Sequence, residues 1–544
     1  MKALNRFSLT LIATLIAITE AAYGTQPPDV VNSDSNNNTA MGTDALEFLS
    51  GGSGSNTAAG YSALVNDTTG SYNTAVGSLA LGANTTGHGN AALGYAALNE
   101  NTTGSSNTAV GSGALQTNNT GVQNTASGND SLQANTTGVD NTASGFNALL
   151  SNTTGSYNTA SGASALFTNT TGQYNTASGY QTLYHNTTGF DNAASGYYAL
   201  GNNTTGVFNT ASGASALEFN TTGSYNTASG YGALDGNESG DNNTASGNFA
   251  LGNNTKGAEN TASGAYALTS NTTGDYNTAS GYEALDSNTI GTYNNASGYF
   301  ALHDNTTGAQ NSASGVQALF GNKTGNYNTA SGTDALYSNT TGSSNIAEGY
   351  KAGYNLTTGS NNIDIGNLGV AAESDTIRIG TTSTHKATYI AGIYGTSVTG
   401  SAVVVSSTGQ LGVTVSSERF KTAIAPMGSN SEKLQQLRPV TFHLKIEPRG
   451  ALQYGLIAEE VAKVYPELVI RDEAGRINGV RYDELAPMLL NEVQKITVQV
   501  EKNAVQEKQN AVQAAEIHDL KQQMAEMYAA LRKLQAKDEF VVRR

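Results

Sequence analysis

The sequence lacks cysteine and tryptophan, and its few prolines avoid most of the chain. The seven prolines are Pro27, Pro28, Pro426, Pro439, Pro448, Pro466 and Pro487. Residues 29–425 therefore contain none, although they are rich in Gly, Asn, Thr and Ser. Collagen is excluded, because it needs proline and a glycine at every third position. A series of ordinary globular domains is excluded as well, since their composition is more even.

Charge is also scarce. Charged residues make up 12% of the chain, against roughly 25% in an average domain. Seven of the 26 Lys and Arg residues, but 24 of the 42 Asp and Glu residues, precede residue 416. Because phosphate binding needs clustered basic side chains, we expect no nucleic-acid partner.

Long hydrophobic runs are missing except near the N-terminus. There Lys2 and Arg6 precede an apolar run over residues 9–18, which small residues follow up to Gly24. This pattern predicts a signal peptide at residues 1–24, with a linker at 25–37. The run is too short to span a membrane. We expect a secreted or cell-surface protein, of bacterial or phage-derived origin, with no transmembrane anchor.

A seventeen-residue repeat fills the body of the chain. With Asn56 as position 1, asparagine recurs every seventeen residues to Asn362, and glycine stands at position 5 throughout. Leucine occupies position 9 from Leu64 to Leu336, so the consensus reads NTASGxxALxxNTTGxx. An earlier copy begins at Asn38, displaced by one residue. This periodicity predicts a solenoid over residues 38–366.

The repeat predicts β rather than α structure, because seventeen residues are too few for a helical hairpin. Glycines at positions 5 and 15 are expected at corners, where they tolerate a positive φ. Strands are expected in both NTAS and xxALxx, and coils stacked at roughly 4.8 Å would form a body about 90 Å long. Proline would remove a ladder donor, which explains its exclusion. The expected fold class is mainly β: a parallel β-roll or solenoid, a small α+β C-terminal domain and a trailing coiled coil.

Identical residues should stack on one another from coil to coil. Ala at positions 3 and 8 and Leu at position 9 would fill a narrow interior, and Asn at positions 1 and 12 would form amide ladders. Each coil buries little apolar surface, so stability must come from stacking and from association of chains. The NTAxGxxAL pattern resembles the head repeats of trimeric autotransporter adhesins. The resemblance implies a parallel β-roll assembled as a trimer.

Several surface features allow two interpretations. Tyrosines at positions 17 and 6 form either an exposed aromatic ladder that stacks on sugars or packing between coils or chains. The NTT triplets match a glycosylation sequon but are more simply turn residues. His88, His185 and His303 do not recur at the period, and no aspartate does, so we expect no metal and no cofactor. The tyrosines are Tyr157, Tyr174, Tyr225, Tyr276, Tyr293 and Tyr327 at position 17, and Tyr180, Tyr231, Tyr282 and Tyr299 at position 6.

The period ends after Gly366, and residues 367–415 alternate apolar with polar or small residues. Ile377 with Ile379, and Val403 with Val405, predict short strands joined by glycine turns. We expect this connector to be a β-stalk.

Four motifs follow in the C-terminal part of the chain. They are SSERFKTAI from Ser416, LRPVTFHLK at 437–445, YGLIAEEVAKVYPELV at 454–469 and VRYDELAPMLL at 480–490. Together they resemble the intramolecular chaperone domain of phage tailspikes and endosialidases, and place such a domain at residues 416–490. The resemblance implies that this domain trimerises, promotes assembly of the β-fibre ahead of it and then cuts itself off.

The same resemblance makes Ser416 the nucleophile and Lys421 its general base, with cleavage between Ser416 and Ser417. Many relatives have aspartate at the position of Ser417. Lysine is a poor base until burial or a neighbouring cation lowers its pKa, and Arg419 is a candidate cation. Five residues on an ideal helix rotate by about 500°, which would point the two side chains apart. Ser416 is therefore expected on extended or turn backbone.

Residues 491–537 predict a coiled coil, followed by a tail at 538–544. Position a holds Leu489, Ile496, Asn503, Asn510, Ile517, Met524 and Leu531, and position d holds Gln506, Gln513, Leu520, Met527 and Leu534. The polar middle would weaken the coil while fixing its register. The alternative is a single amphipathic helix folded back on its own domain.

These patterns together predict a secreted, fibrous homotrimer, similar to a tail fibre or an adhesin, that cleaves itself in cis at most once per chain. No multi-turnover enzyme is expected, since the repeats offer no unique catalytic constellation. The alternative is an ice- or glycan-binding solenoid that uses Thr, Asn and Tyr ladders and is not cleaved.

Overall fold

The computed structural model describes residues 32–49, 54–382, 384–391, 402–406, 408–472 and 474–541. It divides into two compact units, Met1–Gly395 and Thr396–Arg544. The predicted signal peptide at residues 1–24 lies outside the described residues.

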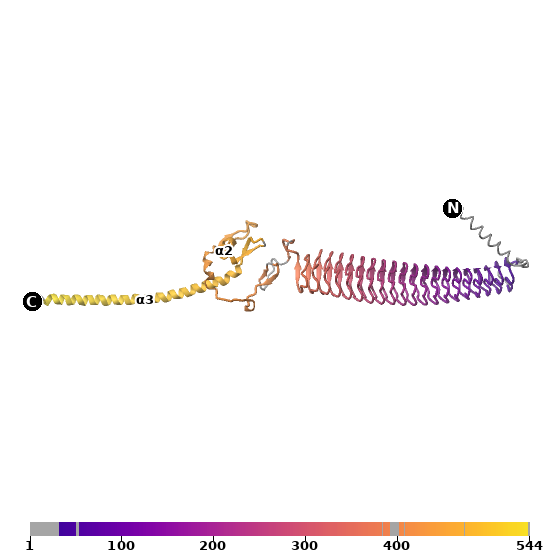
Figure 1. Ribbon diagram of the computed structural model, residues 1–544, viewed down its shortest axis with the longest axis horizontal. Helices are drawn as coiled ribbons and strands as arrows, with labels where there is room; N and C mark the ends of the chain where they lie inside the picture. The colour runs from indigo at the N-terminus through magenta and orange to yellow at the C-terminus, as the bar shows by residue number, and fades with distance from the viewer. Residues whose placement is uncertain are drawn as a thin grey trace. The chain divides into compact units, whose positions relative to one another are not determined.

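The first unit is a solenoid built on one sheet of 22 short strands, seen as a row of stacked coils in Figure 1. The strands are β1 (Asn32–Ser33), β2 (Thr39–Met41), β3 (Thr57–Ala59), β4 (Thr74–Val76), β5 (Ala91–Leu93), β6 (Thr108–Val110), β7 (Thr125–Ser127), β8 (Thr142–Ser144), β9 (Thr159–Ser161), β10 (Thr176–Ser178), β11 (Ala193–Ser195), β12 (Thr210–Ser212), β13 (Thr227–Ser229), β14 (Thr244–Ser246), β15 (Thr261–Ser263), β16 (Thr278–Ser280), β17 (Asn295–Ser297), β18 (Ser312–Ser314), β19 (Thr329–Ser331), β20 (Ile346–Glu348), β21 (Ile363–Ile365) and β22 (Ile377–Ile379). The predicted mainly β solenoid is confirmed.

The strands pair in parallel with a register of one repeat. Thr159 lies opposite Thr176, and Ala160 opposite Ala177, so equivalent residues stack directly. The displaced copy predicted at Asn38 also forms a coil, because β2 pairs with β3 through Thr39 and Thr57.

Each coil contains one strand, at positions 2 to 4, and the strand expected in xxALxx is absent. Positions 7 and 9 of that segment adopt left-handed backbone instead, as at Ser164 (φ 56°) and Leu166 (φ 53°). Left-handed residues at these two alternate positions turn the chain too sharply for a strand. Left-handed backbone costs a non-glycine residue about 1–2 kcal/mol, and full burial of the leucine, worth about 1.5–3 kcal/mol, offsets that cost.

The two glycine positions serve different purposes. Gly162, at position 5, has a φ of 139°, as predicted. Gly155, at position 15, is not in the left-handed region, so the prediction of a positive φ there is wrong. Position 15 needs glycine for space: a Cβ on Gly155 would overlap Oδ1 of Asn152 and the carbonyl oxygen of Gly172.

Two buried amide ladders run along the interior, as predicted. At position 1, the backbone N–H and Nδ2 of Asn158 both donate to Oδ1 of Asn141, at 3.0 and 3.1 Å. At position 12, Nδ2 of Asn152 donates to Oδ1 of Asn135 at 2.8 Å. The two ladders meet at Gly155, whose carbonyl accepts from Asn141 and from Asn152 at 2.9 Å each. The alanines at positions 3 and 8 and the leucines at position 9 are buried beside them.

The N-terminal end of the stack departs from the consensus. Strand β1 pairs antiparallel with β2 and covers the first parallel strand. Asp67 replaces asparagine at position 12 and accepts hydrogen bonds from Nδ2 of Asn84 and the N–H of Gly70, at 3.0 Å each. A carboxylate has no hydrogen to donate, so it suits the coil from which this ladder starts.

The C-terminal end of the stack also departs from the consensus of the repeat. Leu356 occupies position 12 and Asp364 replaces alanine at position 3 of the following coil. Strand β22, which the sequence analysis placed in the stalk connector, pairs in parallel with β21 and is the last strand of the solenoid.

The second unit begins with the antiparallel hairpin of β23 (Val403–Val405) and β24 (Leu411–Val413). The 3₁₀ helices η1 (Glu418–Phe420) and η2 (Gly428–Gln436) follow. Two further hairpins pair β25 (Val440–Phe442) with β26 (Gln453–Gly455), and β27 (Val469–Arg471) with β28 (Ile477–Val480). The helices are α2 (Ala458–Val464), η3 (Pro466–Leu468) and α3 (Tyr482–Val541).

A small core joins α2, β27, β28 and the start of α3. It consists of Val461, Tyr465, Leu468, Val469, Val480, Leu485 and Met488. Polar contacts fix α3 against η2: Ser431 Oγ donates to Glu492 Oε1 at 2.6 Å, and Asn491 Nδ2 donates to the carbonyl of Gly428 at 3.0 Å. These contacts lower the pKa of Glu492, first through Ser431 and then through Lys495.

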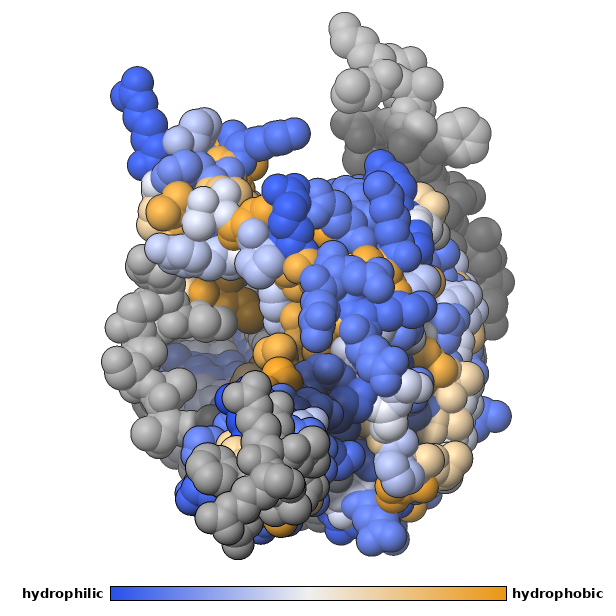
Figure 2. Space-filling model, turned by 90° about the vertical axis from the view of Figure 1, so that its left-hand side faces the viewer, coloured by the Kyte–Doolittle hydropathy of each residue, from blue (hydrophilic) through white to orange (hydrophobic). Residues whose placement is uncertain are grey.

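Helix α3 is continuous across the boundary predicted at 490/491. The side chains of residues 496–536 are exposed, so this part of the helix is not folded back on its own domain. Apolar residues at the predicted a and d positions are among them, including Ile517 (53% exposed) and Leu520 (60%). Apolar side chains are visible at the surface among polar ones in Figure 2. No helix of the described residues is long and apolar enough to cross a membrane.

Candidate functional site

The predicted dyad, Ser416 and Lys421, lies on either side of η1. Ser417 is extended (φ −65°, ψ 142°), and Lys421 is extended again (φ −119°, ψ 144°). The single 3₁₀ turn between them is closed by hydrogen bonds from the N–H of Phe420 to Ser417 O and from the N–H of Lys421 to Glu418 O, at 3.0 and 2.9 Å.

This backbone brings the two side chains together. Nζ of Lys421 donates to Oγ of Ser416 at 3.2 Å. A continuous helix would have separated them, because residues five apart point to different sides. The expectation of non-helical backbone at Ser416 is therefore confirmed.

The surroundings of the pair are open. Ser416, Ser417 and Lys421 are all exposed in the single chain. The guanidinium of Arg419 lies over the ring of Phe420, 4.6 Å from its centroid. The peptide bond between Ser416 and Ser417 is thus on an accessible segment.

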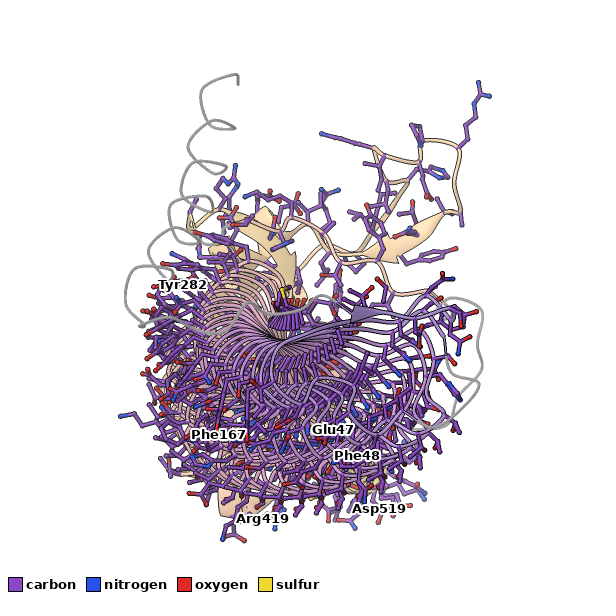
Figure 3. The ribbon with its side chains drawn as sticks, turned by 90° about the vertical axis from the view of Figure 1, so that its right-hand side faces the viewer. Glu47, Phe48, Phe167, Tyr282, Arg419 and Asp519 are labelled. Carbon is purple, nitrogen blue, oxygen red and sulfur yellow. The ribbon has the colours of Figure 1, made fainter. Side chains whose placement is uncertain are left out.

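The tyrosines of the solenoid pack from coil to coil. At position 17 the rings of Tyr157 and Tyr174 stack with centroids 5.0 Å apart. At position 6 the rings of Tyr282 and Tyr299 stack at 5.5 Å. About half of each surface stays accessible, as for Tyr174 (52% exposed), and Tyr282 lies at the outer edge of the coils in Figure 3. Packing between coils is therefore observed, and it leaves one side of the rows exposed.

The NTT triplets form bends, and the first threonine of each pair is tied into the stack. Thr153 Oγ1 donates to Thr170 O, and Thr170 Oγ1 to Thr187 O, at 3.0 Å each. This agrees with their interpretation as turn residues.

The histidines have unrelated partners. Nδ1 of His88 accepts from the N–H of Ser71 at 3.1 Å. His303 lies 3.3 Å from Glu283 and 2.7 Å from Asp304. Among the residues that the structure describes, no three His, Cys, Asp or Glu side chains are grouped to hold a metal ion.

The segment that begins at the dyad matches a known family. Residues 416–470 fit the family described as the chaperone of endosialidase. This chaperone segment contains Ser416 and Lys421 and extends through α2 to β27, whereas the start of α3 lies beyond it. The match covers a small part of the chain, and none of the curated proteins compared with the chain matches it.

The sequence analysis did not anticipate two acidic residues in the solenoid interior, Asp67 and Asp364. Both carboxyl groups are buried, and burial raises their pKa values. The signal was available in the sequence, since each aspartate stands where the consensus has Asn or Ala.

Proposed function

We propose that the chain is a secreted, trimeric β-solenoid fibre protein, similar to a tail fibre or an adhesin. Its C-terminal segment assembles the fibre and then separates from it by cleavage between Ser416 and Ser417. The proposal rests chiefly on the 3.2 Å hydrogen bond from Lys421 to Ser416, at the start of the segment that matches the chaperone of endosialidase.

Exposed apolar side chains of the second unit support association of chains. They include Val403, Val405 and Leu411 in the β23–β24 hairpin, each at least 64% exposed. They also include the a and d positions of α3, which suit a coiled coil of several chains. Bringing chains together at this end lowers the entropic cost of aligning low-complexity repeats before long-range pairing begins.

Association of chains would also give the dyad the buried environment that proton removal from Ser416 needs. An ammonium group cannot accept the Ser416 proton, so Lys421 must be neutral when it acts. Burial of a lysine favours the neutral form and lowers its pKa. Since Lys421 is exposed in one chain, contact with neighbouring chains would activate it, and cleavage would follow trimer formation.

The scissile bond directly follows Ser416, and this position restricts which oxygen atom can attack the carbonyl carbon. A Ser416 oxygen that attacked its own carbonyl carbon would close a strained four-membered ring. The attacking oxygen then comes either from Ser416 of another chain or from a water molecule held by the dyad of the same chain. In either route the peptide nitrogen of Ser417 takes up a proton and leaves as an amine. Attack by water gives the free carboxylate at Ser416 directly, whereas attack by a serine leaves an ester between two chains that water must then hydrolyse.

The first experiment compares the full chain with Ser416→Ala and Lys421→Ala by intact mass spectrometry and native gels. We expect two fragments that meet between residues 416 and 417 in the unsubstituted protein, and intact chains in both variants. Ser417→Ala is the matched control and should still be cleaved. An intact, monomeric unsubstituted protein would contradict both the trimer and the cleavage.

A second experiment separates the two routes. Chains carrying Ser416→Ala are refolded together with unsubstituted chains, so that mixed trimers form. Cleavage of the Ser416→Ala chains in the mixture identifies attack by Ser416 of another chain, whereas Ser416→Ala chains that stay intact identify a dyad that acts with water within one chain.

A further inference from the structure

An open groove runs along the outer surface of the solenoid. It has a volume of about 1040 Å³ and lies between the side chains at position 11 and those at position 13 of successive coils. The position-11 side extends from Thr168 to Asn253, and the position-13 side from Thr187 to Thr272. The buried asparagine ladder of position 12 lies between the two rows, so main chain forms the floor.

The repeat is interrupted within this groove. Phe219 stands at position 11 and is 50% exposed. The next coil has Gly236 at the same position, and a Cβ there would come within 2.9 Å of Gly252 O. That coil also replaces the usual threonine of position 13 with Glu238. The result is an accessible aromatic ring beside a gap, with a carboxylate in the facing row.

The polar groups of the groove present mainly acceptors. Thr204 Oγ1 donates to Thr221 O, and Thr221 Oγ1 donates to Glu238 O, at 2.8 Å each. Because each hydroxyl hydrogen is used within the stack, the threonine oxygens are left to accept hydrogen bonds from outside. Asn202 donates from Nδ2 to Glu218 O at 3.0 Å, which leaves its Oδ1 as an acceptor.

A peptide strand does not fit this surface. Strand addition needs main-chain groups that lack partners. Here the N–H groups of the position-11 row are paired with the next coil, as in Phe219 N–H to Asp235 O at 3.0 Å and Asn253 N–H to Thr269 O at 3.0 Å. Anionic polymers are disfavoured too, since the chain before residue 416 carries 24 acidic and seven basic residues.

We propose that this groove binds a neutral polysaccharide. Its hydroxyl groups would donate to the threonine oxygens, to Asn202 and to Glu238, and one sugar ring would lie against Phe219 in the gap above Gly236. The length of the groove across several coils suits a linear chain rather than a single sugar. This binding is independent of cleavage at Ser416 and of chain association.

The test is affinity electrophoresis of the full chain in gels that contain dextran, laminarin or galactomannan, with hyaluronan as the anionic counterpart. We expect retardation by at least one neutral polymer and none by hyaluronan. Phe219→Ala should weaken binding about tenfold, in line with the loss of one aromatic stacking contact. Glu238→Thr, which restores the consensus of the repeat, should weaken it by a similar factor.

Phe146→Ala is the matched control, because Phe146 is 54% exposed on the solenoid but does not line the groove. It should bind like the unsubstituted protein. The proposal is overturned if none of the neutral polymers retards the protein, if hyaluronan binds best, or if the two phenylalanine variants lose binding equally.

Discussion

Single residues at the two ends of the solenoid behave differently from those of the repeat. An asparagine inside the stack both donates and accepts, so the ladder satisfies it: Asn141 Nδ2 donates to Asn124 Oδ1, and Asn141 Oδ1 accepts from Asn158 Nδ2. Asp67 accepts the equivalent hydrogen bonds of its neighbours without donating. Asp364 is 1% exposed, and neither of its carboxylate oxygens has a hydrogen-bond partner. A buried carboxyl without partners is more stable when it is protonated.

Asp364 makes stability depend on pH at the C-terminal end of the stack. Burial raises its pKa from 3.8 to about 6, the nearby Glu373 adds to the rise, and Arg378 opposes it. Between about pH 4 and pH 6 the folded state therefore binds more protons than the unfolded state, so stability falls as the pH rises through this window. Asp364→Asn should remove this dependence and stabilise the last coil at pH 7. Hydrogen exchange of the backbone amides of residues 346–366 between pH 4 and pH 8 measures how this stability depends on pH.

The control is Asp375→Asn, since Asp375 is exposed and Asn361 donates to it. It should keep the pH dependence of the unsubstituted chain. The same dependence in Asp364→Asn would show that another group is responsible.

At the scale of elements, α3 is the one long helix among the described residues, and many of its apolar side chains are exposed. Met524 is 50% exposed and Leu531 is also 50% exposed, one heptad apart. Placing lysines at these positions would force like charges together at the centre of a coiled coil. We expect Met524→Lys combined with Leu531→Lys to convert the proposed trimers into monomers, as measured by light scattering after size-exclusion chromatography.

The matched control is the double variant Gln522→Lys with Ala529→Lys. Both residues lie one heptad apart on the side of the helix that faces away from the predicted a and d positions. This pair adds the same charge and should remain trimeric. Dissociation of both double variants would mean that charge alone, and not the a position, determines assembly.

The elements also show how far the sequence could be interpreted. A fixed period and recurring small residues predicted a strand in NTAS, which the structure places at positions 2 to 4, together with the register and both amide ladders. The strand expected in xxALxx was wrong, because a leucine with positive φ runs against the intrinsic preference of its backbone and is stabilised only by burial, as at Leu166. The reason predicted for glycine at position 15, a positive φ, was wrong. Glycine is needed there for lack of space, and the space around Gly155 depends on its neighbours in the stack.

The two candidate sites also differ in how far the sequence predicted them. The spacing of Ser416 and Lys421 required non-helical backbone, and that requirement follows from helix geometry alone. The groove at Phe219 and Glu238 was not predicted, because both residues depart from the consensus of the repeat and the consensus therefore leaves them out. Departures from the repeat at exposed positions were the signal that could have found it.

At the scale of the whole molecule, the solenoid is modular, since each coil contacts its neighbours through the same hydrogen bonds. Deleting residues 158–174 removes one complete coil and joins Tyr157 to Asn175, which restores the consensus. We expect this shortened chain to fold with unchanged far-ultraviolet circular dichroism per residue and with a thermal midpoint close to that of the full chain.

Deleting residues 158–165 instead removes about half a coil. This change places position 9 beside position 17 and interrupts both amide ladders, so buried amides lose their partners. Cooperative unfolding should split or shift to lower temperature. Equal behaviour of the two deletions would contradict the stacking of equivalent residues.

Because the coils are nearly identical in sequence, the interior of the stack hardly specifies which coil pairs with which. A slip of one segment by seventeen residues exchanges nearly identical sequences, so the interior of the stack resists such a slip only weakly. The mismatch appears at the ends, where Asp67 would lose its place at the start of a ladder and Asp364 would enter a coil built for alanine. We therefore infer that the irregular end coils set the register, and with it the length, of the solenoid. Substitutions there are expected to produce mixtures of lengths rather than unfolded chains.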